Sequence, residues 1–119
     1  YLHSHPVDVA CISYIIGKWI NLSSSELLNL VHSGLLHDIG KAKIRDSLLN
    51  KKTKLTDEEM EIMRSHPVVG YQLLDNPELH EQDILDGVLS HHERYDGSGY
   101  PYGLWSAGLR PRPCLIIAR

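Results

Sequence analysis

The sequence is poor in the residues that build several common classes of site. Among 119 residues it has two cysteines, Cys11 and Cys114, and they form no CxxC pair. This argues against a zinc ribbon and a disulfide framework and fits a reducing compartment, so we expect a cytoplasmic protein. No apolar run approaches the length of a membrane span, and no signal peptide is visible.

Excess positive charge is absent as well. Twelve Lys and Arg against fifteen Asp and Glu give a net charge of −3 with histidine neutral. The chain therefore has no basic field of the kind that binds a large nucleic acid. An acidic domain can still bind a small phosphate ligand if metal ions supply local positive charge. The length and the 42% hydrophobic content predict one small globular domain.

The pattern of apolar residues predicts helices and no strand. A first helix runs through residues 7–19, with Pro6 in its first turn. Ser23 with Glu26 is a capping box that opens a second helix, for which Gly40 marks the end. The apolar face of that helix consists of Leu27, Leu28, Val31, Leu35 and Leu36.

The second half of the chain continues the helical pattern. Residues 46–50 predict a short helical turn, and Thr56 with Glu59 is a second capping box. Pro67 interrupts that helix, and further helices cover residues 69–74 and 84–89. Residues 96–113 hold four glycines and three prolines and predict a loop. We expect an all-α bundle with a core that includes Tyr14, Trp19, Tyr71 and the leucine and isoleucine stripes.

Histidine is the one residue type in clear excess, with eight in the chain. His37-Asp38 follows an apolar helix, where a histidine also suits the helix dipole without any ligand. Asp38 favours a site, because a carboxylate at a helix C-terminus is disfavoured unless a cation lies nearby. His91-His92 also follows an apolar helix, where a solvated helix end is the alternative. His66 and His5, each taken alone, indicate nothing.

Taken together, these histidines and Asp38 form a more specific pattern. Four helix ends carry histidine, and helix ends of a bundle can converge on one pocket. Imidazole with carboxylate suits iron, manganese or a similar divalent metal. Two such metals about 3.5–4 Å apart activate water and hold a phosphoryl group for in-line displacement. The pattern predicts a metal-dependent site for phosphate chemistry.

Two motifs resemble one known family. His37-Asp38 with Gly40-Lys41 resembles the signature of the HD phosphohydrolases, and residues 91–101, HHERYDGSGYP, resemble the longer HD-GYP signature. Residues 55–70 also match that family. The resemblance implies an HD-domain helical bundle and a bacterial signalling phosphodiesterase that hydrolyses cyclic di-GMP to pGpG, GMP or both.

The resemblance also implies roles for individual residues. The metal ligands would be His5, His37, Asp38, His66, His91 and His92. Asp38 would bridge two metals, most commonly iron or manganese, and would be catalytic together with Lys41. Lys41 and Arg94 would contact the substrate, and the Gly99-Tyr100-Pro101 loop would contact partners such as receiver or diguanylate cyclase domains.

His3 competes with His5 for the first ligand position, and the spacing to Gly17-Lys18 favours His5. Tyr1 stands where some members have a glutamate that adds a third metal, so we expect two metals. Arg45 replaces a usual proline, and residues 105–113 lack the usual acidic residues. The family places one more aspartate ligand beyond Arg119. We therefore expect residues 1–119 to be a partial domain, incomplete at both ends and impaired as it stands.

Two other functions remain open on the sequence. One keeps the enzyme class but changes the substrate to another nucleotide or cyclic dinucleotide. The other is a non-catalytic module that binds a cyclic dinucleotide or a partner through Tyr100 and its loop. The presence of His37, Asp38 and His91 favours an enzyme. His32 and His80 match no motif and are expected to be structural or exposed.

Overall fold

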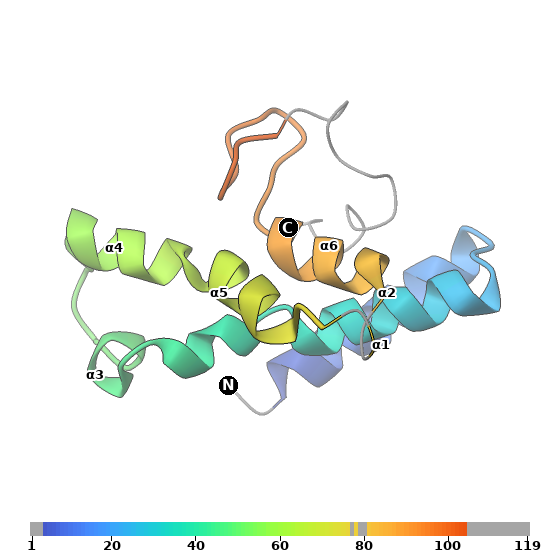
Figure 1. The fold of residues 1–119 in the computed structure, drawn as a ribbon, viewed down its shortest axis with the longest axis horizontal. Coiled ribbons are helices and arrows are strands. Elements are labelled where there is room, and N and C mark those ends of the chain that lie inside the picture. The colour runs from blue at the N-terminus through green and yellow to red at the C-terminus, as the bar shows by residue number, and fades with distance from the viewer. Residues whose placement is uncertain (1–3, 77, 79–80, 105–119) are drawn as a thin grey trace.

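The computed structural model describes residues 4–76, 78 and 81–104, and within these ranges every regular element is a helix (Figure 1). The elements are α1 (His5–Trp19), α2 (Ser24–Leu36), the 3-10 helix η1 (Ile39–Lys43), α3 (Asp46–Leu49), α4 (Asp57–Arg64), α5 (His66–Leu74) and α6 (Gln82–Ser90). Residues 91–104 form a loop after α6. The predicted all-α fold is confirmed.

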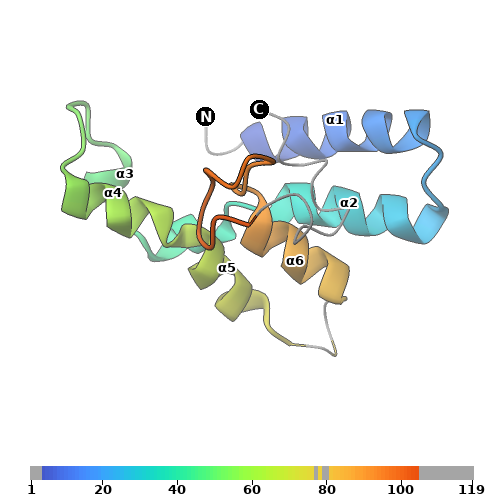
Figure 2. The same ribbon diagram turned by 90° about the horizontal axis from the view of Figure 1, so that it is seen from above.

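The helices are arranged around the end of α2. Helices α1 and α2 lie side by side, α6 packs against α2 and α5, and α5 packs against η1 (Figure 2). A core cluster of Leu74, Leu85 and Val88 joins α5 to α6. Leu36, Ile39 and Tyr71 pack against this cluster, so the predicted burial of Tyr71 is confirmed in part. The described helices include none with the length and apolar character of a membrane span.

On α1, the buried residues that face α2 are small ones, and they meet leucines of α2. The buried residues of α1 are Ala10, Ser13 and Gly17. A Cβ on Gly17 would lie 2.6 Å from the Leu27 Cδ1 atom, so the two helices approach closely there. Trp19 is 77% exposed and Tyr14 is 49% exposed, so the prediction that both lie in the core is wrong. The close packing of these small residues leaves Tyr14 and Trp19 outside the buried contact.

Helix α2 buries the expected face only in part, since Leu27, Val31 and Leu36 are half-buried. Leu28 and Leu35 are exposed, and the prediction that both belong to the buried face is wrong. The buried positions are Leu30, Ser33 and Gly34. The Ser33 hydroxyl donates to the Asn29 carbonyl at 2.9 Å and lies 3.4 Å from the Ile84 carbonyl of α6. A polar side chain can therefore occupy this interface because its hydrogen bonds are made within it.

The predicted N-terminal capping boxes of two helices are confirmed. Ser23 with Glu26 and Thr56 with Glu59 both form complete capping boxes. Pro67 divides the chain as expected, since α4 ends at Arg64 and α5 begins at His66. The proline lies in the first turn of α5, where its missing N–H costs no helical hydrogen bond.

Gly40 does not end a helix, so that prediction is wrong. Helix α2 ends four residues earlier, at Leu36, and Gly40 lies inside η1. A Cβ at Gly40 would overlap the His66 carbonyl oxygen and lie 2.7 Å from the Gly70 amide nitrogen. The glycine is needed for the close approach of η1 to α5. This contact brings Asp38 and His66 together.

Gly40→Ala should therefore destabilise the fold by about 3 kcal/mol or more, because the new methyl group meets backbone that cannot move independently. Chemical denaturation followed by circular dichroism measures the change. Gly70→Ala tests the same contact from the other side, since its Cβ would lie 3.0 Å from the Val88 Cγ1 atom and 3.3 Å from the Gly40 amide nitrogen, without the overlap found at Gly40. We expect Gly70→Ala to destabilise the fold by clearly less than Gly40→Ala. Equal stabilities for both variants would contradict this packing.

Candidate metal and active site

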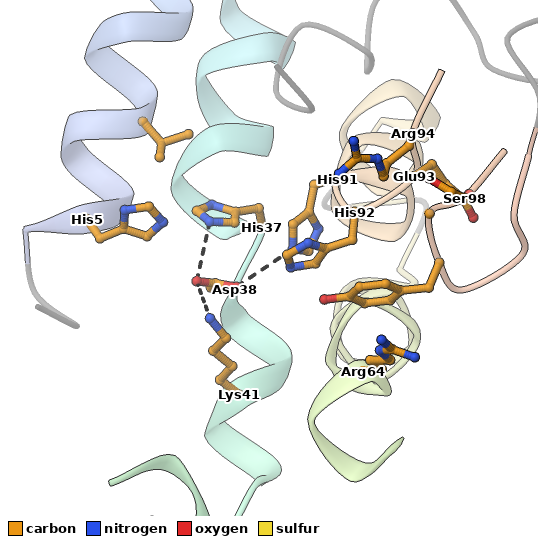
Figure 3. A pocket seen from close by; sticks show the side chains of 13 residues that line it. His5, His37, Asp38, Lys41, Arg64, His91, His92, Glu93, Arg94 and Ser98 are labelled. Atoms are coloured by element: carbon orange, nitrogen blue, oxygen red, sulfur yellow. Dashed lines mark hydrogen bonds and ion pairs between the residues drawn. The ribbon is translucent and has the colours of Figure 1, made fainter. Parts of the chain in front are cut away.

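Residues from several helix ends meet around Asp38. His37 caps the C-terminus of α2, Asp38 precedes η1, and His66 begins α5. His91 caps the end of α6 and His92 follows it, while His5 begins α1. A pocket of about 400 Å³ is lined by these groups except His66, which is buried (Figure 3). The structure thus brings together all six side chains that the sequence nominates as ligands.

Asp38 is the centre of the cluster. Its Oδ1 atom lies 3.2 Å from His66 Nε2 and 3.7 Å from His91 Nε2. Its Oδ2 atom lies 3.4 Å from His37 Nε2. The Nε2 atoms of His66 and His91 are themselves 3.0 Å apart. Three imidazole nitrogens from three helix ends therefore face one carboxylate.

The opposite side of each of these imidazoles is fixed by the backbone. His37, His66 and His91 each place Nδ1 at 2.7 Å from a carbonyl oxygen three residues earlier, on Gly34, Met63 and Val88 respectively. A carbonyl oxygen can only accept, so each Nδ1 carries the proton. In the neutral form, each ring then presents an Nε2 lone pair to Asp38. Metal-binding histidines commonly have such a backbone partner for their other nitrogen.

With all three rings neutral, the cluster is a set of acceptors that face one another. Within the part of the chain that the structure describes, the buried Oδ1 atom of Asp38 accepts no hydrogen bond. Neutral imidazoles with Nδ1–H have nothing to donate to it. A positive charge is needed between these groups, and either extra protons or a metal ion can supply it. The donor set fits a metal of the kind that imidazole and carboxylate bind.

Burial disfavours the extra protons at two of the histidines. Burial, together with the neighbouring His91 and His66, lowers the pKa of His92 to about 3. Burial also lowers the pKa of His91. For Asp38, burial by itself raises the pKa, but the hydrogen bonds that the His37, His66 and His91 rings donate when Nε2 is protonated, together with the Lys41 ammonium, outweigh it and hold the pKa well below its usual range. The carboxylate is thus ionised while His91 and His92 favour the neutral form that binds metals.

The ligand atoms fall into two groups that share one residue. Asp38, His66, His91 and His92 each offer an atom within 4.8 Å of the others, and so do His5, His37 and Asp38. His5 and His37 also lie in edge-to-face contact, with ring centroids 5.2 Å apart. Either group is large enough to hold a cation, and Asp38 belongs to both.

Three cationic side chains line the same pocket. Lys41 donates to the Asp38 Oδ2 atom at 2.7 Å. Arg94 is 63% exposed and lies 3.8 Å from Asp96 Oδ1, so the guanidinium is at the rim (Figure 3). Arg64 ends α4, and its Cζ atom lies 5.6 Å from the centre of the Tyr100 ring. The pocket can therefore attract an anionic ligand despite the negative net charge of the chain.

The loop after α6 carries a buried carboxylate, Glu93, which belongs to the His91-His92-Glu93 signal in the sequence. Glu93 is 0% exposed and accepts from the backbone N–H groups of Tyr102 and Leu104, at 2.7 and 2.8 Å. Glu93 and Arg64 both lie inside the recognised motifs but had no role assigned. The signal for Glu93 was its position beside His91-His92 at the end of a buried helix.

The remaining sequence predictions have mixed outcomes. His32 is exposed, as expected. His3, His80, Tyr1 and residues 105–113 lie outside the described residues. The Gly99-Tyr100-Pro101 loop is partly buried, and its contact with partner domains stays a prediction. Ser98 lines the pocket without having been nominated.

Comparison with known proteins identifies the class that this fold and site define. The family model for the HD domain matches residues 4–111, so the chain belongs to the HD domain family. The HDG"Y"P protein Bd1817 of Bdellovibrio bacteriovorus has the same fold, with a TM-score of 0.83 at 22% identity, over 98% of this chain and 38% of that one.

The curated relatives are phosphodiesterases of cyclic dinucleotides. The cyclic di-GMP phosphodiesterase response regulator RpfG of Xanthomonas campestris pv. campestris is 43% identical over 110 residues, which are 90% of this chain and 28% of that protein. The 3'3'-cGAMP-specific phosphodiesterase 2 of Vibrio cholerae is 33% identical over 82% of this chain and 19% of that protein. The chain thus spans about a quarter or less of these relatives.

The arrangement of acceptors makes a direct prediction about protonation. In long-range proton–nitrogen correlation spectra, His37, His66 and His91 should all carry a proton on Nδ1, because each Nδ1 faces a carbonyl oxygen. His32, which is exposed, serves as the internal comparison with an unconstrained ring. A spectrum in which any of the three carries its only proton on Nε2 would contradict the geometry.

Proposed function

We propose that this protein is a metal-dependent phosphodiesterase that hydrolyses cyclic di-GMP to pGpG, GMP or both. The observation that carries the proposal is the convergence of three backbone-fixed imidazoles on the buried Asp38 carboxylate. The relatives named as cyclic di-GMP phosphodiesterases support the substrate, and the HD domain supports metal dependence.

We propose two divalent metal ions, with iron or manganese as the preferred elements. Asp38, His66, His91 and His92 would hold one ion, and His5, His37 and Asp38 the other. Asp38 would bridge them, because its two oxygens face different groups of imidazoles. When bound, such ions activate water and polarise a phosphoryl oxygen.

The other pocket residues would act on the substrate. Lys41 borders the Asp38 carboxylate and would lie beside a phosphate held at the cluster, where its charge offsets the charge that develops on phosphorus oxygens. Arg94 at the rim would meet the rest of the anionic ligand, because its side chain is exposed to solvent beside the pocket. The positive charge of Arg94 would also attract the anionic substrate from a distance and so speed association. Added salt would weaken this effect.

A second substrate is favoured by one observation. The similar Vibrio cholerae protein is specific for 3'3'-cGAMP, which has the same phosphodiester ring with one guanine replaced by adenine. The metal cluster acts on the phosphodiester, which both ligands share. The choice between them therefore depends on contacts with the bases, outside the cluster.

We expect the full-length protein, supplied with manganese or iron(II), to convert cyclic di-GMP to pGpG or GMP, as measured by chromatography. Asp38→Asn should lower kcat by at least about 100-fold, because it removes the charge that both groups share. Lys41→Met should also lower kcat by about 100-fold or more while metal content is kept. Elemental analysis of each variant separates a loss of bound metal, expected for Asp38→Asn, from a loss of charge stabilisation with the metal retained, expected for Lys41→Met.

Asp75→Asn is the matched control, since this exposed residue ends α5 away from the pocket and should leave kcat unchanged. Faster hydrolysis of 3'3'-cGAMP than of cyclic di-GMP would favour the second substrate. Binding of either dinucleotide without hydrolysis, in protein that is fully loaded with metal, would contradict the enzyme and favour a binding module.

A further inference from the structure

His92 differs from the other histidines of the cluster in how its ring is held. The rings of His37, His66 and His91 are each fixed by a backbone carbonyl at 2.7 Å. Among the described residues, the His92 imidazole has no such hydrogen-bond partner. Its ring nevertheless belongs to the group with Asp38, His66 and His91, whose ligand atoms lie within 4.8 Å of one another. Something else has to fix its orientation.

The Tyr100 ring provides that restraint. It stacks on the His92 imidazole with ring centroids 4.5 Å apart and an angle of 16° between the planes. Arg64, at the end of α4, lies over the Tyr100 ring with its Cζ atom 5.6 Å from the centroid. His92 also meets His66 edge-to-face at 5.0 Å. Stacking fixes the plane of a ring without using either of its nitrogens, which leaves both free for other contacts.

The loop that carries Tyr100 is held against His92 by a backbone hydrogen bond and by close backbone packing. The Tyr100 amide donates to the His92 carbonyl oxygen at 3.1 Å. A Cβ on Gly99 would lie 2.5 Å from both that oxygen and the Glu93 Cα atom, so only glycine permits the approach. The Glu93 carboxylate accepts from the Tyr102 and Leu104 amides, on the far side of Tyr100. The loop is thus held on both sides of the tyrosine.

We propose that Tyr100, supported by Arg64 and by the Glu93-anchored loop, is a positioning residue that sets the orientation of His92 as a metal ligand. This inference rests on the proposed metal function. It assigns the tyrosine of the GYP motif a role inside the site, through His92. It also predicts a selective effect, because the stack touches the group that contains His66, His91 and His92 and does not touch the His5 and His37 group.

The stack can be tested first without metal. Ring-current effects should shift the His92 ring protons upfield in wild type. Tyr100→Phe should keep this shift, because the aromatic plane remains, and Tyr100→Leu should remove it. Tyr95→Leu is the matched control on the same loop, since Tyr95 is 80% exposed. An unshifted His92 ring in the wild-type protein would overturn the inference whatever the metal content.

The metal titration then tests the positioning role. Tyr100→Leu should raise the Kd of one of the two manganese ions by about 10–100-fold, as loss of a group that orients a ligand does. The other ion should bind unchanged, and Tyr100→Phe should restore wild-type affinity. Arg64→Met should weaken the same ion to a smaller extent. Glu93→Gln should raise the Kd of the same ion as Tyr100→Leu does, because it releases the loop that carries Tyr100. If Glu93→Gln does not fold, the Tyr100 variants alone test the positioning role.

The outcomes separate this inference from the function on which it rests. Wild-type protein that binds no manganese contradicts the proposed metal site, although the His92 ring shift is still observed. Wild-type protein that binds two ions, with Tyr100→Leu binding both equally well, overturns the positioning role alone. Equal weakening of both ions in Tyr100→Leu would also overturn it, because that result indicates general loosening of the fold.

Discussion

The contact of the buried Asp38 carboxylate with imidazole nitrogens, which cannot donate to it while the rings are neutral, is the interaction on which the rest of the site depends. The Nδ1 atoms of three histidines donate to backbone carbonyls, so in the neutral rings the Nε2 lone pairs point at the carboxylate and at one another. Such an arrangement is unfavourable in a folded protein unless positive charge lies within it. Lys41 reaches one oxygen, and Oδ1 is left to the imidazoles.

The backbone makes this arrangement possible through close approaches that only small residues permit. Gly40 lets η1 contact the start of α5 and places Asp38 beside His66. Ala10, Ser13 and Gly17 let α1 approach α2, so that His5 reaches His37. Gly99 lets the last loop close onto the end of α6. The histidines supply the chemistry, and the glycines determine where the histidines meet.

Much of this could be predicted from local sequence signals, and the failures share one cause. Capping boxes and the break at Pro67 depend on hydrogen bonds within a few residues, so they were predicted correctly. The role of Gly40 and the exposure of Trp19 depend on segments distant in sequence, and the stack of Tyr100 on His92 depends on the irregular path of a loop, which no periodic pattern encodes. Periodicity says which residues share a helix face, and it does not say which face another helix covers.

The most direct test of this account is anomalous diffraction from crystals of the full-length protein grown with manganese. The account predicts two peaks about 3.5–4 Å apart on either side of Asp38. One should lie among His66, His91 and His92, and the other beside His5 and His37. A single peak bound through one Asp38 oxygen would contradict the shared carboxylate. The absence of any peak at the cluster, in crystals with manganese bound elsewhere, would contradict the metal site itself.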